Sequence, residues 1–186
     1  MVPRHESVEI GTGWDDLALA RRGNQKAWRA LFEQYSPRLL RMAALITGST
    51  DAARDCVQET FVRVLSSVVH HESGSLRAYL STIAYRLALK ERMRLGRLAR
   101  VAVAEPPSPD PSPLDEAITD ERQREFARAL WALPAHHREI LILRLHGDHS
   151  YEEIAEITGL PLGTVKSRIF HAVKSVRSEI KNRGVL

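Results

Sequence analysis

Five side chains that can donate hydrogen bonds recur on one side of a segment near the carboxyl end of the chain. They are Thr164, Ser167, Arg168, His171 and Lys174. Their spacing of i, i+3, i+4, i+7 and i+10 places them on one helical face, and no acid occurs between residues 157 and 178. Such side chains can reach base edges in the major groove of DNA, and neighbouring Lys166 suits a phosphate. The pattern indicates a nucleic-acid contact, and the alternative is a solvated basic face on a structural hairpin.

A second basic segment lies near the middle of the chain. Residues 86–100 contain six Arg or Lys side chains and one acid, Glu91. Four of the cations share a helical face: Arg86, Lys90, Arg94 and Arg97. Aligned cations suit a phosphate backbone, and the neighbouring Tyr79 and Tyr85 could stack on an unpaired base. Arginine-rich helices are also commonly exposed without a ligand, so both interpretations stay open.

A third surface is acidic and polar. One side of a predicted helix carries Asp55, Gln58, Glu59 and Arg63. The opposite side of the same helix is apolar, with Val57, Phe61 and Val64. Charged side chains on a face of this kind are most often solvated, so the residue types alone do not predict a docking site.

The sequence contains no recognisable catalytic or metal-binding motif. It lacks the phosphate-binding loop G-x-x-x-x-G-K-[ST], the nucleophile elbow G-x-S-x-G and the zinc motif H-E-x-x-H. His146 and His149 have a spacing seen in metal sites, but Gly147 and Asp148 between them predict a turn, and no third ligand lies nearby in sequence. Cys56, the single cysteine, falls in an apolar stripe and is expected to be an inert core thiol. We therefore expect no enzyme, no metal and no other cofactor.

The first basic face belongs to the second helix of a predicted helix-turn-helix. Ser150 and Glu153 form an S-x-x-E capping box, which marks a helix start. Gly159 supplies the tight turn after this helix, and the helix that follows turns Val165 and Ile169 inward. Two helices joined in this way are typical of a DNA-binding unit.

The other two polar surfaces belong to a predicted helical bundle in the first half of the chain. Apolar residues recur there at helical spacing, over residues 28–46, 53–68 and 76–87. We expect the first helix to bend or break at Ser36-Pro37 and to end at Gly48. We expect Asp51 to cap the next helix. No strand-like alternation accompanies these stripes.

An acidic, proline-rich segment separates the two halves. Residues 101–116 carry five prolines and no basic residue, which opposes both helix formation and packing. The sequence therefore predicts an all-α protein of two small helical domains. We expect a flexible amino-terminal segment, a first domain, a linker and a second domain at residues 1–14, 15–98, 99–117 and 118–182.

The composition is compatible with a nucleic-acid-binding protein. The 27 Lys and Arg exceed the 23 Asp and Glu, which gives a formal charge of +4 and makes polyanionic partners plausible. Apolar residues make up 44%, but no run approaches the roughly 20 apolar residues that cross a bilayer. The amino terminus lacks the apolar core of a secretory signal, and one cysteine cannot form an internal disulfide. We therefore expect a cytoplasmic location.

Four segments stand in a specific order along the chain. They are DAARDCVQETF at 51–61, LRAYLSTIA at 76–84, Leu133-Pro134 with the apolar run after it, and YEEIA at 151–155 followed by GTVKSRIF at 163–170. Together these segments resemble bacterial sigma factors of the sigma-70 family, in particular the extracytoplasmic-function (ECF) group. The resemblance spans nearly all of residues 15–180.

The resemblance implies a dissociable, non-catalytic subunit that binds core RNA polymerase and confers promoter recognition. The first domain, region 2 of the family, would dock on the clamp coiled coil of the largest polymerase subunit through Asp55, Gln58, Glu59 and Arg63. It would read and open the minus-ten element with Tyr79, Tyr85, Arg86, Lys90, Arg94 and Arg97. The second domain, region 4, would read the minus-thirty-five duplex with Thr164, Lys166, Ser167, Arg168, His171 and Lys174.

This chain departs from the family pattern in the segment that resembles the minus-ten reader. Tyr79 stands where the family usually has Trp, and Thr82 stands where it has Arg. Arg86 lies near the position of a base-contacting Asn, so a cation replaces a reader of base edges. Tyr79 can still stack, and the recognised minus-ten base stays open.

Two other function classes are compatible with a helix-turn-helix. One is a dimeric repressor or activator that binds operators without polymerase, which predicts an effector or phosphoacceptor domain in residues 15–98. The other is a helical adaptor with protein partners only. No segment resembles a self-inhibitory domain, so we expect control by a separate anti-sigma protein. In many relatives that protein is membrane-bound, whereas we expect no membrane insertion of this chain.

Overall fold

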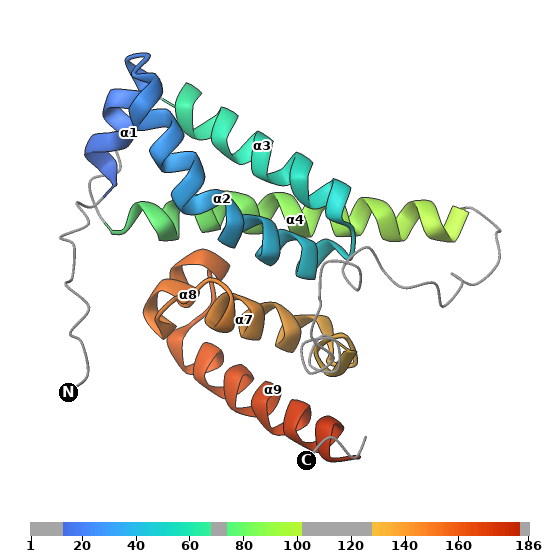
Figure 1. Ribbon diagram of the computed structural model, residues 1–186. Helices are drawn as coiled ribbons and strands as arrows, with labels where there is room; N and C mark the ends of the chain where they lie inside the picture. Colours follow the sequence, from blue (N-terminus) through green and yellow to red (C-terminus); the bar gives the residue numbers. More distant parts are fainter. Residues whose placement is uncertain (1–12, 68–73, 102–127, 183–186) are drawn as a thin grey trace, which may run out of the picture.

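The computed structural model describes residues 13–67, 74–101 and 128–182. The first block contains α1 (Trp14–Arg21), α2 (Gln25–Thr47), α3 (Thr50–Ser66) and α4 (Leu76–Val101) (Figure 1). The second block contains α7 (Ala135–Leu145), α8 (Tyr151–Thr158) and α9 (Leu162–Asn182). Within these ranges no residue lies in a strand, which confirms the all-α prediction. The predicted linker lies mostly outside the described residues.

Local side-chain chemistry sets the predicted start and end of α8. The Ser150 hydroxyl accepts a hydrogen bond from the Glu153 amide at 3.0 Å, and the Glu153 carboxylate accepts one from the Ser150 amide at 2.9 Å. Gly159 ends the helix with φ of 69°, a left-handed conformation that glycine adopts without strain. The predicted capping box and turn are both present.

The junction of α2 and α3 differs in one respect from the prediction. Gly48 ends α2 with φ of 74°, as expected. The cap of α3 is Ser49, however, whose hydroxyl accepts a hydrogen bond from the Ala52 amide at 3.2 Å. Asp51 lies inside the first turn, where its charge still favours the helix dipole. Asp51 was the wrong choice because the helix begins one residue before it.

Of the bend or break expected at Ser36-Pro37, the break does not occur. Helix α2 continues through Pro37 from Gln25 to Thr47. Proline removes one backbone hydrogen bond, but buried Leu31 and Leu39 lie on either side of it and pack into the same core. Tertiary packing of this apolar stripe therefore outweighs the local penalty.

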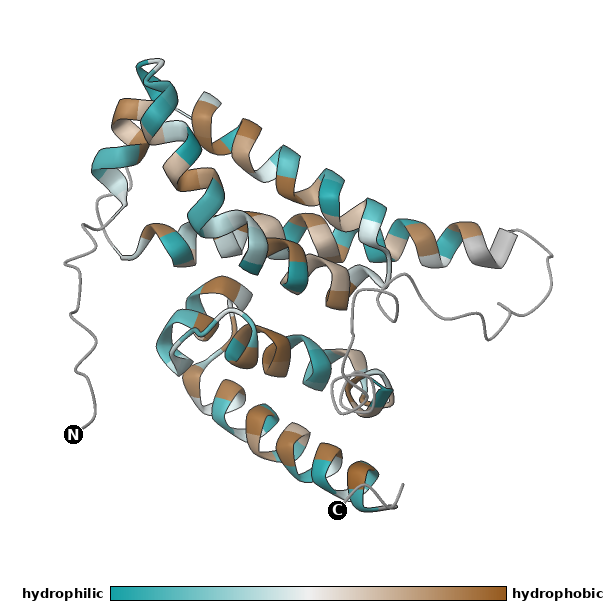
Figure 2. Cartoon of the chain, in the orientation of Figure 1, coloured by the Kyte–Doolittle hydropathy of each residue, from teal (hydrophilic) through white to brown (hydrophobic). Residues whose placement is uncertain are grey.

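Each block buries the inward faces of its helices. In the first block, Met42 and Ile46 of α2 are 1% and 0% exposed, and α2, α3 and α4 all contact one another. In the second block, Val165 and Ala172 of α9 are fully buried, and α9 contacts both α7 and α8. Figure 2 shows the resulting pattern, with hydrophobic residues along one side of the helices and hydrophilic residues along the other.

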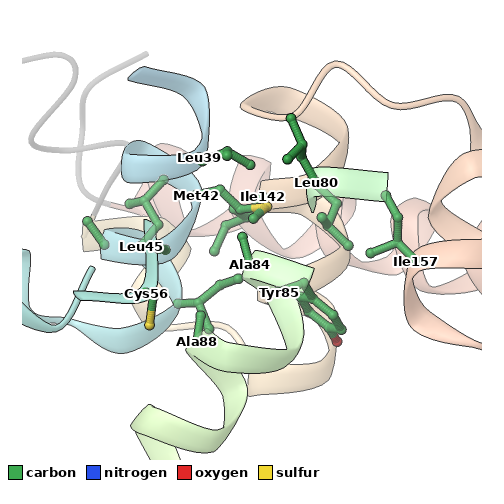
Figure 3. Close-up of a cluster of buried hydrophobic side chains, with 14 of the residues drawn as sticks. Leu39, Met42, Leu45, Cys56, Leu80, Ala84, Tyr85, Ala88, Ile142 and Ile157 are labelled. Atoms are coloured by element: carbon green, nitrogen blue, oxygen red, sulfur yellow. The ribbon is translucent and has the colours of Figure 1, made fainter. Parts of the chain in front are cut away.

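The two blocks also pack against each other. Helix α8 contacts α4, and α7 contacts α2 (Figure 1). The buried apolar side chains of both blocks form one cluster, which includes Leu39 and Met42 of α2, Leu80 of α4, and Ile142 of α7 (Figure 3). The sequence pattern predicts the blocks but not this contact between them.

Candidate nucleic-acid and polymerase interfaces

Helix α9 lies on the side of the second block that is farther from the first block (Figure 1). Its predicted contact residues Lys166, Ser167, His171 and Lys174 are exposed, and Thr164 and Arg168 are partly exposed. The opposite face is anchored by α7 and α8, because buried α9 residues pack into the core of the block. The helix-turn-helix thus presents hydrogen-bond donors and cations on a rigid element, as groove recognition requires.

Two histidines at the start of α7 extend this surface. The rings of His137 and His171 stack with centroids 6.2 Å apart, and His136 lies 4.3 Å from His137. Burial lowers the pKa of His137, and the nearby His136, His171 and Arg168 add to that effect. His137 is thus half-buried, and its surroundings disfavour the charged form of its ring.

The sequence analysis did not select Phe170, which is 65% exposed in α9. Its ring meets that of His171 edge to face with centroids 5.5 Å apart. An apolar ring on a basic face can contact the methyl group of thymine. Position 170 lies outside the apolar stripe of α9. A large apolar residue outside that stripe was the signal in the sequence that could have identified Phe170 as a surface residue.

The basic face of α4 is also exposed. The side chains of Arg86, Lys90, Arg94 and Arg97 all reach solvent. Arg94 donates two hydrogen bonds through its Nε to Glu91, at 2.9 and 3.0 Å, and this interaction lowers the pKa of the Glu91 carboxyl. One predicted phosphate contact is thus partly neutralised by its own helix.

The two tyrosines near this face are not equivalent. Tyr79 is partly exposed, and its ring lies 5.4 Å from that of Trp14. Tyr85 is buried, and its hydroxyl donates a hydrogen bond to Oε2 of Glu139 in α7 at 3.0 Å. Burial and the adjacent carboxylate raise the pKa of Tyr85. The expectation that Tyr85 stacks on an unpaired base does not fit this conformation, because the ring is buried and its hydroxyl is bonded to Glu139.

The polar face of α3 is fully accessible. Asp55, Gln58, Glu59 and Arg63 are all exposed, and Arg63 donates to Glu59 at 2.6 Å one helical turn away. Val62 beside them is 56% exposed and adds an apolar element that the sequence analysis did not single out. Neither α2 nor α4 covers this face, so a partner of mixed polar and apolar character can reach it.

The remaining chemistry-bearing residues are structural. Cys56 is 5% exposed, and burial raises the pKa of its thiol to about 11. His149 is fully buried, with Nε2 2.9 Å from the Ser81 hydroxyl of α4. Among the described residues, no group of three or more His, Cys, Asp or Glu side chains could hold a metal ion. In the same part of the chain, no helix has the length and apolar character needed to cross a membrane.

Comparison with known families identifies the family to which each helical block belongs. Residues 31–98 match the model of sigma-70 region 2, and residues 123–176 match that of sigma-70 region 4. Sigma factors have no catalytic activity of their own. The alternative of a dimeric regulator is not favoured, because such a regulator requires an effector domain in the part of the chain that region 2 occupies.

Individual relatives give the same result. The ECF RNA polymerase sigma factor SigL of Mycobacterium tuberculosis is 33% identical over 161 residues, which cover 84% of this chain and 90% of SigL. RpoE of Cereibacter sphaeroides is 30% identical, with 91% of this chain and 96% of RpoE covered. SigE of Mycolicibacterium smegmatis is 34% identical, and the match spans 83% of this chain but 63% of SigE.

Solved structures share the fold. The sigma factor RpoE of Bartonella quintana, in complex with the anti-sigma factor NepR, superposes with a TM-score of 0.66 at 28% identity, covering 84% of this chain and 98% of that one. CnrH, solved with the cytosolic domain of CnrY, has the same TM-score at 22% identity and covers 92% of this chain and 99% of that one. The order of the two regions, the helix-turn-helix and these relatives together establish that the chain belongs to the ECF family of RNA polymerase sigma factors.

Proposed function

We propose that this chain binds core RNA polymerase and directs transcription initiation at specific promoters through three separate surfaces. The polymerase-binding surface is the exposed face of α3. The minus-ten surface lies on α4 and the minus-thirty-five surface on α9. The observation that carries the proposal is the presence of both sigma regions in family order, each with its polar face exposed. The chain supplies recognition, and the polymerase supplies the catalysis.

The α3 surface is the proposed docking site for the clamp coiled coil of the largest polymerase subunit. Asp55, Gln58 and Glu59 offer one amide and two carboxylates, and exposed Val62 offers apolar contact area. Packing within the chain requires none of these side chains, because the buried side of α3 supplies its contacts with α2 and α4. Polar groups around a small apolar contact are typical of a protein interface.

The two DNA surfaces are proposed to recognise different states of the promoter. The α9 face fits the major groove of a duplex, where Ser167, Arg168 and His171 would read base edges and Lys166 would contact a phosphate. On α4, the exposed cations would follow the backbone, and Tyr79 would stack on an unpaired base. The domain boundaries proposed for these roles are residues 15–98 and 118–182.

We propose that a separate anti-sigma protein controls the chain, which works in the cytoplasm with the polymerase. Support comes from the RpoE structure, which was solved as a complex with an anti-sigma factor. Such a protein would inhibit by covering surfaces needed for polymerase binding, including Asp55 to Arg63.

The α3 surface can be tested directly by measuring affinity for core polymerase. The double variant Gln58→Ala, Glu59→Ala should bind core at least tenfold more weakly and retain its helicity by circular dichroism, since both side chains are exposed. Glu33→Ala, which removes an exposed carboxylate from α2, is the matched control and should bind normally. Unchanged core affinity in the double variant would exclude this docking surface.

A further inference from the structure

Two aromatic rings from different helices meet at one end of the first block. The rings of Trp14 in α1 and Tyr79 in α4 have centroids 5.4 Å apart, and their planes are tilted by 42°. Both side chains are partly exposed, and the starts of α1 and α4 lie at the same end of the block (Figure 1). Helical periodicity does not predict this pair, because its members belong to separate elements.

The Trp14 ring is held in place by its own hydrogen bond and by the backbone that carries it. Its Nε1–H donates a hydrogen bond to the Gly74 carbonyl just before α4, at 3.0 Å. Gly13 precedes α1 with φ of 75°, and a Cβ atom there would stand 2.7 Å from the Tyr35 hydroxyl oxygen. The backbone next to Trp14 is therefore packed closely onto the bundle. A ring fixed in this way loses little conformational entropy when a ligand stacks on it.

Other residues of α1 anchor this helix to the bundle. Leu17 and Ala20 are 2% and 9% exposed and pack into the core. Arg21 donates two hydrogen bonds to the Val64 carbonyl of α3, at 2.8 and 3.1 Å. Because α1 is held by these contacts, the accessible part of the Trp14 ring is available for a partner outside the chain.

The aromatic pair continues the basic face of α4. Tyr79 precedes Arg86 by about two helical turns, so the two side chains project from the same side of the helix. The other cations of this face follow toward the carboxyl end of α4, at Lys90, Arg94 and Arg97. A single strand of DNA whose phosphates follow these cations would bring its bases to the aromatic pair. A row of cations that leads to aromatic rings is typical of proteins that bind single-stranded nucleic acid.

We propose that Trp14 is a second base-stacking residue of the minus-ten surface and acts together with Tyr79 on unpaired bases. The ligand is single-stranded DNA, because the faces of a base inside a duplex are covered by its neighbours. Unlike Tyr85, both rings are partly accessible while the two blocks are packed together. The proposal rests on the sigma-factor function above and adds one residue to its minus-ten surface.

The test compares two single-stranded probes that differ only in their bases. One is an octamer of thymidine, and the other is an octamer of abasic deoxyribose phosphates with the same charge. Fluorescence anisotropy measures the affinity of the free chain for each labelled probe, and the ratio of the two affinities isolates base stacking from phosphate contacts. The wild-type chain should bind the thymidine octamer about tenfold more tightly, the order expected from base stacking.

Substitutions of Trp14 should change this affinity ratio. Trp14→Leu keeps an apolar side chain but removes the aromatic ring, and it should lower the ratio to about threefold because Tyr79 remains. Trp14→Phe loses the hydrogen bond to Gly74 but keeps a ring, and it should retain most of the ratio. Trp28→Leu is the matched control. It should leave the ratio unchanged, because the Trp28 ring packs against Phe61 of α3 and not against α4.

The fluorescence of Trp14 reports stacking without any substitution of this residue. The sequence contains three tryptophans, so Trp28→Phe combined with Trp131→Phe leaves Trp14 as the single one. Its emission should be quenched by the thymidine octamer and not by the abasic octamer. In the wild-type background, Lys90→Ala removes an exposed cation and no ring, and it should weaken the binding of both probes alike.

The outcomes separate stacking by Trp14 from a purely structural role. Equal affinity of the wild-type chain for the two octamers, which includes no measurable binding to either, would overturn the proposal. A Trp14→Leu variant with lower thermal stability and an unchanged affinity ratio would also overturn it, because Trp14 would then only pack against α4. Circular dichroism identifies a variant that fails to fold, and quenching of Trp14 emission then decides.

A separate measurement distinguishes failure of the proposal from failure of the sigma-factor function. Transcription by the wild-type chain with core polymerase tests the function alone. If transcription starts at specific promoters while Trp14→Leu leaves the affinity ratio unchanged, the function stands and only the role of Trp14 is wrong. If the ratio changes as expected but the chain does not initiate transcription, the function is wrong and the stacking site stands.

Discussion

Helices α4 and α9 are the two proposed DNA-contacting elements, and their candidate contact residues differ in exposure. Of the hydrogen-bond donors on the outward face of α9, Lys166, Ser167, His171 and Lys174 are exposed and Arg168 is partly exposed. On α4, the cations from Arg86 to Arg97 are exposed, but Tyr85 among them is buried against α7. The comparison indicates that most of the polar face of α9 is accessible while the two blocks are packed together, in what we call the closed form, whereas Tyr85 of α4 is not.

The largest expected effect concerns the α9 side of this comparison. Arg168→Ala should weaken binding of the free chain to a minus-thirty-five duplex by about 1–3 kcal/mol, since a base contact would be lost. Arg86→Ala on α4 removes an exposed arginine from the other surface and should leave this affinity unchanged. Fluorescence anisotropy with a labelled duplex measures both. Equal losses in the two variants would show that the charge on the whole chain, and not the α9 face, determines binding.

Acid should favour separation of the two regions from the closed form. His149 is enclosed by Ser81 and Arg77 of α4, Glu153 of α8 and the adjacent Asp148. Burial lowers the pKa of His149 from 6.5 to about 4, so the closed form holds it neutral while the open form takes up a proton below pH 6.5. Stability of the closed form is therefore present above pH 6.5 and is lost progressively toward pH 4.

Between pH 7.5 and 5.5 this linkage shifts the opening equilibrium about tenfold, at 1.36 kcal/mol for each pKa unit. Glu153 acts in the same direction but at lower pH. Burial raises its pKa, but hydrogen bonds from the Ser150 amide of its own helix and from Ser75 and Arg77 across the contact lower it to about 2. Only the contributions of Ser75 and Arg77 depend on the closed form. Energy transfer between dyes attached to cysteines introduced at the exposed positions Ser66 in α3 and Ser178 in α9 should decrease over this range. His149→Gln should remove most of the pH response, and a response that persists in this variant would contradict the assignment to His149.

An effect of similar size should follow from the buried tyrosine of α4. Tyr85→Phe removes the hydrogen bond to Glu139 but keeps an aromatic ring for stacking. The loss of a buried hydrogen bond to a charged group should shift the equilibrium toward the open form by about 1–2 kcal/mol. Energy transfer in the free chain measures the shift, and permanganate reactivity of the minus-ten thymines measures melting. Increased opening together with normal melting is expected, whereas reduced melting would mean that the hydroxyl itself contacts DNA.

The smallest expected effect tests which residues of α9 contact bases and which contact phosphates. Lys166→Ala should weaken binding to all duplex sequences alike and should flatten the dependence of log K on log salt by about 0.9, the value for one phosphate contact. Titrations at several salt concentrations on matched and mismatched duplexes measure both quantities. If this variant changes sequence preference, the division of α9 into base readers and phosphate contacts is wrong.

The sequence predicted the features that depend on nearby residues. The Ser150 and Glu153 capping box, the turn at Gly159 and the end of α2 at Gly48 all follow from chemistry within a few residues. The α3 cap was misplaced by two residues because Ser49 and Asp51 are both good capping residues. The predicted break at Pro37 failed because buried contacts along α2 compensate for the lost hydrogen bond.

The contact between regions could not be predicted because its partners are far apart in the sequence. Glu139 and Tyr85 are 54 residues apart, and Glu153 and Arg77 are 76 apart. In the sequence, Glu139 resembles a solvent-facing helical carboxylate, and Tyr85 resembles a ring available for stacking. Glu139 and Tyr85 are buried because the two helical blocks pack against each other. Helical periodicity within each block carries no information about how the blocks pack.

The carboxylate of Glu153 has a consequence for the kinetics of promoter search. It accepts hydrogen bonds from Arg77 across the regions and from the Ser150 amide within its own helix. If α8 separates from α4, Glu153 loses its hydrogen bonds with Arg77 but keeps the one from the Ser150 amide. The start of α8 therefore stays capped, and the helix-turn-helix separates from α4 as an ordered unit. The helix-turn-helix then does not have to fold on the promoter, so no conformational entropy is lost at that step. The rate of association with DNA can therefore be limited by diffusion and electrostatic attraction alone.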